Sequence, residues 1–191
     1  MSLYTTDSVE TYTAAEKYIL EIPKFTRKNS IKDTSCFLEH LGTPEEKTKT
    51  IHVAGTNGKG SVCAYLCSIL KEAGFSTGMF ISPHLVTMRE RFLINGEMVS
   101  EEEFLWAFRC VAGKLRQLPE TLQKISYHPT FFEYLFFMAM ALFARHEVEY
   151  MILETGLGGR LDATNSIEKK DMCVISSIGY DHMEYLGETL P

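Results

Sequence analysis

Residues 55–61 read Gly-Thr-Asn-Gly-Lys-Gly-Ser, a glycine-rich run with one lysine and two hydroxyl residues. Glycines let the backbone bend so that successive N–H groups face inward, where they can bind an anion. The Lys59 ammonium can reach the outer phosphates of a nucleotide, and Ser61 offers a hydroxyl. The run is shorter than the common G-x-x-x-x-G-K-[ST] loop. We predict a nucleotide-binding loop whose ligands are Thr56, Asn57, Gly58, Lys59, Gly60 and Ser61.

Glu154 is the second residue whose type and position could serve chemistry. It ends the apolar run 150–153 and precedes a glycine-rich stretch, 155–165. Magnesium prefers oxygen ligands, typically one or two carboxylates together with substrate phosphates. A carboxylate that ends a strand beside a phosphate loop meets that need. A plain glycine-rich loop is the alternative, but it explains neither the glutamate nor the Arg-Leu-Asp run at 160–162.

Two further polar residues follow apolar runs of strand type. Ser82 follows the run 78–81, and His182 lies shortly after the run 173–176. Taken alone, a Ser-Pro pair is usually a turn, and an isolated histidine near a sheet is more often structural. Ligands of α/β sheets bind outside the carboxyl ends of the strands. Ser82, Glu154 and His182 would meet at one such edge, so the sequence predicts a metal site there.

The elements that must position these residues alternate along the chain. We predict helices over 9–22, 31–41, 62–73, 101–118 and 130–145, strands over 50–54, 78–81, 150–153 and 173–176, and a polar loop over 83–97 with an Asn95-Gly96 turn. This order favours an α/β fold with a P-loop-containing parallel sheet flanked by helices. The strand before residues 55–61 and the helix after them favour a phosphate loop over a bare glycine turn.

Composition narrows the class of protein. The 191 residues carry a net charge of -6 with mixed signs, so no basic stripe for a nucleic-acid partner is expected. The five cysteines form no Cys-x-x-Cys pair, which makes a zinc or redox site improbable. The longest apolar run, 131–144, is shorter than a membrane span. With no export signal, we expect a cytoplasmic protein that binds no membrane.

Three motifs together resemble the folylpolyglutamate synthase and dihydrofolate synthase family, part of the larger group of Mur-type ligases. They are Ile51–Ser61, the Ser82-Pro83-His84-Leu85 run with Glu90-Arg91-Phe92 behind it, and Leu153–Asn165. The resemblance implies a Mur-ligase-like central domain that uses ATP and Mg²⁺. It implies Ser82, Glu154 and His182 as metal ligands, the last within an H-x-x-x-L-G motif, and Lys59, Glu154 and His182 as catalytic residues.

The resemblance also implies a binding site for the pterin of a folate. Its residues would be Thr130, Phe131, Phe132, Glu133, Leu161, Asp162 and Ala163. Periodicity alone explains the aromatic residues of 130–145 as core, whereas a carboxylate such as Glu133 could accept the N–H groups of a pteridine.

The implied reaction adds L-glutamate to a folate, or to dihydropteroate, through an acyl phosphate made with ATP. Residues 1–191 would then be the N-terminal part of the ATP-binding ligase domain of a monomeric enzyme. The rest of that domain, with a carbamylated lysine, and a C-terminal domain would follow, so we expect this chain alone to be inactive. Three alternatives stay open: a UDP-muramyl amino-acid ligase, a simple P-loop NTPase or kinase, and a non-catalytic nucleotide- or pterin-binding module.

Overall fold

A single sheet positions the predicted site. In the computed structural model, which describes residues 9–22, 29–42, 48–180, 183 and 187, six strands pair in the order β4-β3-β2-β5-β1-β6. Their bounds are β1 Lys49–Ala54, β2 Thr77–Phe80, β3 Phe92–Ile94, β4 Glu97–Met98, β5 Tyr150–Glu154 and β6 Met172–Ile175. The strands β2, β5, β1 and β6 are parallel, so their carboxyl ends share one edge, whereas β3 and β4 are antiparallel.

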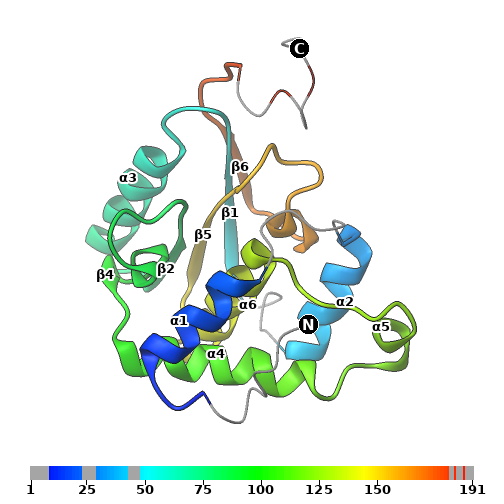
Figure 1. Ribbon diagram of the computed structural model, residues 1–191. Coiled ribbons are helices and arrows are strands. Elements are labelled where there is room, and N and C mark those ends of the chain that lie inside the picture. Colours follow the sequence, from blue (N-terminus) through cyan, green and yellow to red (C-terminus); the bar gives the residue numbers. More distant parts are fainter. Residues whose placement is uncertain (1–8, 23–28, 43–47, 181–182, 184–186, 188–191) are drawn as a thin grey trace.

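Helices cover both faces of this sheet (Figure 1). The helix α3 packs on one face, and α6 packs on the other beneath α1, α2 and α4. The helices are α1 Tyr12–Glu21, α2 Ile31–Leu41, α3 Lys59–Glu72, α4 Glu101–Leu115, α5 Glu120–Lys124 and α6 Phe131–Arg145, with 3-10 turns η2 Met88–Arg91 and η3 Ala163–Ser166. No helix in the described part of the chain is both long and apolar enough to cross a membrane.

The α6 helix forms the centre of the larger core. Twelve of its residues are buried, on all sides of the helix, as expected for a helix enclosed by other elements. Two glycines let its aromatic rings approach β2 and the loop after β5. A Cβ at Gly78 would lie 2.4 Å from Phe143, and a Cβ at Gly156 would lie 2.6 Å from Phe132. These close contacts fix α6 relative to β2 and to the loop after β5.

Capping residues set several helix ends. Ser100 and Glu103 form a capping box at the start of α4, and Ser30 with Asp33 forms another at α2. Gly42 ends α2 in the left-handed conformation that glycine adopts without strain. These serine, acidic and glycine residues therefore determine the start of α4 and both ends of α2.

The structure differs from the sequence prediction in the loop 83–97 and at several helix ends. The predicted loop 83–97 contains η2 and a short hairpin, β3–β4, so the sheet is mixed rather than wholly parallel. Asn95 and Gly96 form its turn with positive φ angles of 51° and 77°, as a tight hairpin requires. The first helix begins at Tyr12 rather than at residue 9, and the fourth ends at Leu115, before the unpredicted α5. Strands of two or three residues are too short to show a periodic pattern.

Candidate nucleotide and metal site

The glycine-rich run connects β1 to α3, as predicted. Gly55 has a φ of 137° and passes so close to Ser176 that a Cβ would lie 2.1 Å from its Oγ. Gly58, with a φ of 83°, is the N-cap of α3, which begins at Lys59. The N–H groups of the first helical turn have no partner within the helix, so those of residues 59–61 are available to an anion.

The first half of the run faces a different partner. The N–H groups of Thr56 and Asn57 donate to the carbonyl of Ser177, at 2.9 and 3.3 Å. The Thr56 hydroxyl accepts from the N–H of Gly179 at 3.0 Å and donates to its carbonyl at 3.1 Å. The segment that follows β6 therefore braces the loop from outside. The predicted role of Thr56 and Asn57 in binding ATP stays a prediction, and their own N–H groups are engaged within the chain.

Three of the predicted residues meet at the carboxyl edge of the sheet. The Lys59 ammonium donates to the carbonyls of Gly55 and Thr56, at 3.0 and 3.3 Å, and lies 4.0 Å from Oε1 of Glu154. The other carboxylate oxygen of Glu154 accepts the N–H of Ser82 at 2.9 Å. Strand order explains this meeting, because β5 lies between β1 and β2 and carries Glu154 between the other two residues.

Glu154 is a buried charge with incomplete compensation. Only 4% of its surface is exposed, and this burial raises its pKa, whereas the Ser82 N–H, Lys59 and Arg91 lower it. A carboxylate taken out of water is stabilised by a cation held against it. Its oxygens and the neighbouring Ser82 are donors of the kind that Mg²⁺ accepts, so this part of the predicted metal site fits the ion.

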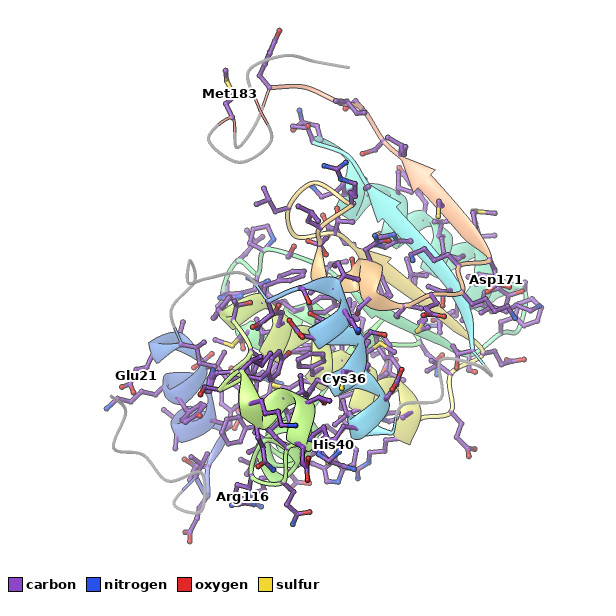
Figure 2. All side chains as sticks on the ribbon, turned by 90° about the vertical axis from the view of Figure 1, so that its right-hand side faces the viewer. Glu21, Cys36, His40, Arg116, Asp171 and Met183 are labelled. Atoms are coloured by element: carbon purple, nitrogen blue, oxygen red, sulfur yellow. The ribbon has the colours of Figure 1, made fainter. Side chains whose placement is uncertain are left out.

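The third predicted metal ligand, His182, lies outside the described residues. The neighbouring Met183 is described, and Figure 2 shows it at the opposite end of β6 from Asp171, beyond the carboxyl end of the strand. Within the described residues, no group of three or more His, Cys, Asp and Glu side chains is arranged to hold a metal.

Arg91 is a charged residue beside this site that was not among the site residues predicted from the sequence. It is 6% exposed, its Nε donates to Nδ1 of His84 at 2.8 Å, and its guanidinium lies 5.5 Å from the centre of the Phe131 ring. Burial lowers the pKa of Arg91 to about 10, and the charge of Glu154 raises it. Arg91 belongs to the Glu90-Arg91-Phe92 run, one of the motifs that resemble the family. Membership of that motif was the sequence signal that could have identified Arg91 as a site residue.

Glu90 shapes the loop after Ser82. Its carboxylate accepts the N–H groups of Leu85, Val86 and Thr87 at 2.7 to 2.9 Å. These bonds lower its pKa, and they leave the side chains of Leu85 and Val86 each 90% exposed at the sheet edge.

The predicted pterin-side residues fall into two groups. At the start of α6, Glu133 is 4% exposed, and its Oε2 accepts from the N–H of Thr130 and the amide of Asn29, each at 2.7 Å. Glu133 thus closes a capping box and ties α6 to Asn29, two residues before α2. Phe131 lies against Arg91, and Phe132 packs on Gly156. The Thr-x-x-Glu spacing of a capping box was the signal for this structural role.

The second group, Leu161 to Ala163, divides by exposure. Leu161 is 56% exposed, whereas Asp162 and Ala163 are buried at 3% and 6%. Oδ2 of Asp162 accepts the N–H groups of Gly156 and Leu157, at 2.9 Å each, so Asp162 builds the loop that follows Glu154. The pterin contacts predicted for these residues stay a prediction.

Comparison with known proteins agrees with this geometry. The model of the Mur ligase middle domain matches residues 53–190. The chain belongs to this family. The match includes the phosphate loop, Ser82, Glu154 and the bracing segment after β6. The carboxyl edge of the sheet described above therefore lies within the residues that match this family.

Named relatives of this Mur ligase middle domain are folate enzymes. A folylpolyglutamate synthase of Arabidopsis thaliana is 50% identical over 156 residues, 81% of this chain and 27% of the relative. A dihydrofolate synthase/folylpolyglutamate synthase of Bacillus subtilis is 41% identical over 181 residues, 94% of this chain and 41% of the relative. The chain therefore spans between about a quarter and two fifths of their length.

Solved structures share the fold. E. coli FolC in complex with DHPP and ADP is 33% identical with a TM-score of 0.83, over 95% of this chain and 41% of the other. The FPGS-AMPPCP-folate complex is 28% identical with a TM-score of 0.86, over 94% of this chain and 43% of the other.

Proposed function

We propose that this Mur ligase middle domain supplies the phosphate- and metal-binding half of a folylpolyglutamate synthase. The reaction would join L-glutamate to a folate with ATP, and the same site would serve dihydropteroate if the parent enzyme is bifunctional. The observation that carries the proposal is the meeting of Lys59, Glu154 and Ser82 at one sheet edge. The DHPP and ADP bound to E. coli FolC and the AMPPCP and folate of the FPGS complex support it.

Lys59 and the first turn of α3 would bind the phosphates of ATP. The Lys59 ammonium now interacts with two loop carbonyls and Glu154, and a γ-phosphate would take the place of these weaker partners. The N–H groups of residues 59–61 would add neutral donors aimed along the helix axis. Fixed donors of this kind stabilise the charge that develops during phosphoryl transfer.

Glu154 and Ser82 would hold Mg²⁺, with His182 as a further ligand. When bound, the ion would neutralise charge on the phosphates and on the acceptor carboxylate. Oε1 of Glu154 would face the phosphate loop, because the Ser82 N–H already binds the other carboxylate oxygen, Oε2. Arg91 adds a second positive charge to the same edge of the sheet.

The folate would lie on the side of the loop after β5 and the start of α6. Thr130, Phe131, Phe132, Glu133, Leu161, Asp162 and Ala163 are the residues proposed there, with the exposed Leu161 best placed to touch a ligand. We further propose that the parent enzyme is a cytoplasmic monomer. No nucleic-acid or membrane partner forms part of this proposal.

Calorimetric titration of the chain tests the assignment. Mg²⁺-AMPPCP should bind the wild type and lose at least about tenfold in affinity in Lys59→Met, because a charge-assisted phosphate contact is lost. Lys71→Met is the matched control, since Lys71 is exposed at the far end of α3. Tetrahydrofolate should bind and a UDP-muramyl peptide should not. Binding of the muramyl peptide alone would assign the chain to cell-wall ligases instead.

A further inference from the structure

A hydrogen-bonded chain of three buried side chains connects β1 to the loop after β5. His52, on β1 and 6% exposed, has its Nε2 atom 2.7 Å from Oγ1 of Thr164. The Thr164 side chain is fully buried in η3, and its Oγ1 donates to Oδ1 of Asp162 at 2.6 Å. None of these contacts involves the residues proposed for phosphate or metal binding.

The direction of each hydrogen bond follows from the chemistry of the groups. Asp162 in its carboxylate form can only accept, and it receives four donors: the N–H groups of Gly156, Leu157 and Thr164, and the Thr164 hydroxyl. Because the single hydroxyl proton of Thr164 points to Asp162, its Oγ1 must accept from the histidine. His52 is therefore the donor, through a protonated Nε2.

The charge state of His52 agrees with this direction. Burial, followed by the charge of Lys170, lowers the pKa of His52, while Asp162 raises it in part. At pH 7 the ring is thus neutral, and a neutral imidazole carries one proton. With that proton on Nε2, Nδ1 is unprotonated.

These hydrogen bonds hold the backbone where it leaves β5. Two of the N–H groups that Asp162 accepts belong to the second and third residues after Glu154. Gly156 is also packed under the Phe132 ring, so the ring and Asp162 both hold the start of this loop. At the other end of this series of hydrogen bonds, His52 lies on β1, the strand that leads into the phosphate loop.

We propose that His52 and Thr164 are positioning residues that, through Asp162, set the folate-side loop 156–162 in place relative to the phosphate loop. The pocket that this loop shapes is the pterin side of the proposed function, on which this part of the inference rests. Removing the Thr164 hydroxyl would leave the His52 N–H buried without a partner and Asp162 with one donor fewer. The loop would then loosen while the sheet stays intact.

Amide hydrogen exchange tests the positioning role without any substrate. In Thr164→Val, exchange at Gly156 and Leu157 should accelerate by roughly tenfold, the effect of losing about one buried hydrogen bond. Exchange at Thr155, whose N–H donates to the Val53 carbonyl within the sheet, should not change. Thr164→Ser keeps the hydroxyl and should restore slow exchange. Equal acceleration at Thr155, or no acceleration at Gly156 and Leu157, would overturn the proposal.

The nitrogen NMR spectrum of the histidine ring gives an independent readout. At pH 7 the wild type should show His52 protonated at Nε2 only, and Thr164→Val should alter this signal. A His52 ring protonated at Nδ1 alone would contradict the donor direction.

Ligand titration separates this inference from the proposed function. Thr164→Val should weaken tetrahydrofolate binding about tenfold or more while Mg²⁺-AMPPCP binding stays within about twofold of the wild type, if one buried hydrogen bond orders the loop. If the exchange result holds and wild-type chain binds no folate, the positioning stands and the folate assignment falls. If folate binds equally well to both forms, the role in shaping the pocket falls.

Discussion

The Lys59 ammonium lies 4.0 Å from Oε1 of Glu154, although Lys59 begins α3 and Glu154 ends β5, far along the sequence. Both side chains are largely buried, so their charges interact in a medium of lower dielectric constant than water. At 4.0 Å the two groups are too far apart for a hydrogen bond, so each charged group could take a different partner. A phosphate for Lys59 and a metal ion for Glu154 are the exchanges that we propose.

Glu154 should make stability depend on pH. Its pKa is raised in the folded chain, so it contributes stability below the unfolded pKa of about 4.3 and loses that contribution as the pH rises through the folded value. Relative to Glu154→Gln, the wild type should lose free energy of unfolding as the pH rises above about 4.3. Urea denaturation at several pH values measures the difference. Mg²⁺ at neutral pH should stabilise the wild type only, and parallel pH curves would refute the prediction.

Thr56 should support nucleotide binding by holding the phosphate loop to Gly179. Thr56→Val removes both hydrogen bonds of the hydroxyl to Gly179, each worth about 1 kcal/mol. We expect a loss of about 1–2 kcal/mol in the free energy of unfolding and a weaker binding of Mg²⁺-AMPPCP.

Thr56→Ser is the matched control, because serine keeps the hydroxyl. It should bind the nucleotide as the wild type does. If valine at this position left binding and stability unchanged, the brace after β6 would have no role in holding the loop.

Gly156 should tolerate no side chain. A Cβ there would lie 2.6 Å from the ring of Phe132, and the ring belongs to a packed helix. Gly156→Ala should lower the free energy of unfolding by about 1–3 kcal/mol, measured by urea denaturation, as overpacked cores do. Gly159→Ala serves as control: its Cβ would lie 3.7 Å from that of Ala54, an ordinary contact, and we expect a change within about 0.5 kcal/mol.

Glu133 should contribute mainly to the stability of the fold. Glu133→Gln replaces a buried acceptor of the Thr130 N–H and the Asn29 amide, which should cost about 1–3 kcal/mol in thermal or urea unfolding. Glu103→Gln changes the equivalent residue of the more exposed capping box at α4 and should cost about 1 kcal/mol or less. A loss of folate affinity in Glu133→Gln without any loss of stability would favour the pterin contact instead.

Local sequence patterns determined the elements and their chemistry. The apolar runs at 50–54 and 150–153 correspond to β1 and β5, and Ser100 with Glu103 marks the start of α4, because these signals depend on neighbouring residues alone. The same pattern at Thr130 and Glu133 forms the capping box of α6, and the folate contact that the resemblance implies for these residues stays a prediction. The hairpin β3–β4 was missed because its strands are too short for a periodic signal.

Only the tertiary structure decided which distant residues touch. The order β2-β5-β1-β6 places Glu154 between Ser82 and Lys59, and no local pattern encodes that order. The brace between Thr56 and Gly179 and the chain from His52 to Thr164 join residues more than a hundred positions apart. The sequence by itself therefore determined which groups could do chemistry. Long-range packing decided which of them are held together, because hydrogen bonds of this kind form only once the sheet and helices have brought their donors and acceptors within reach.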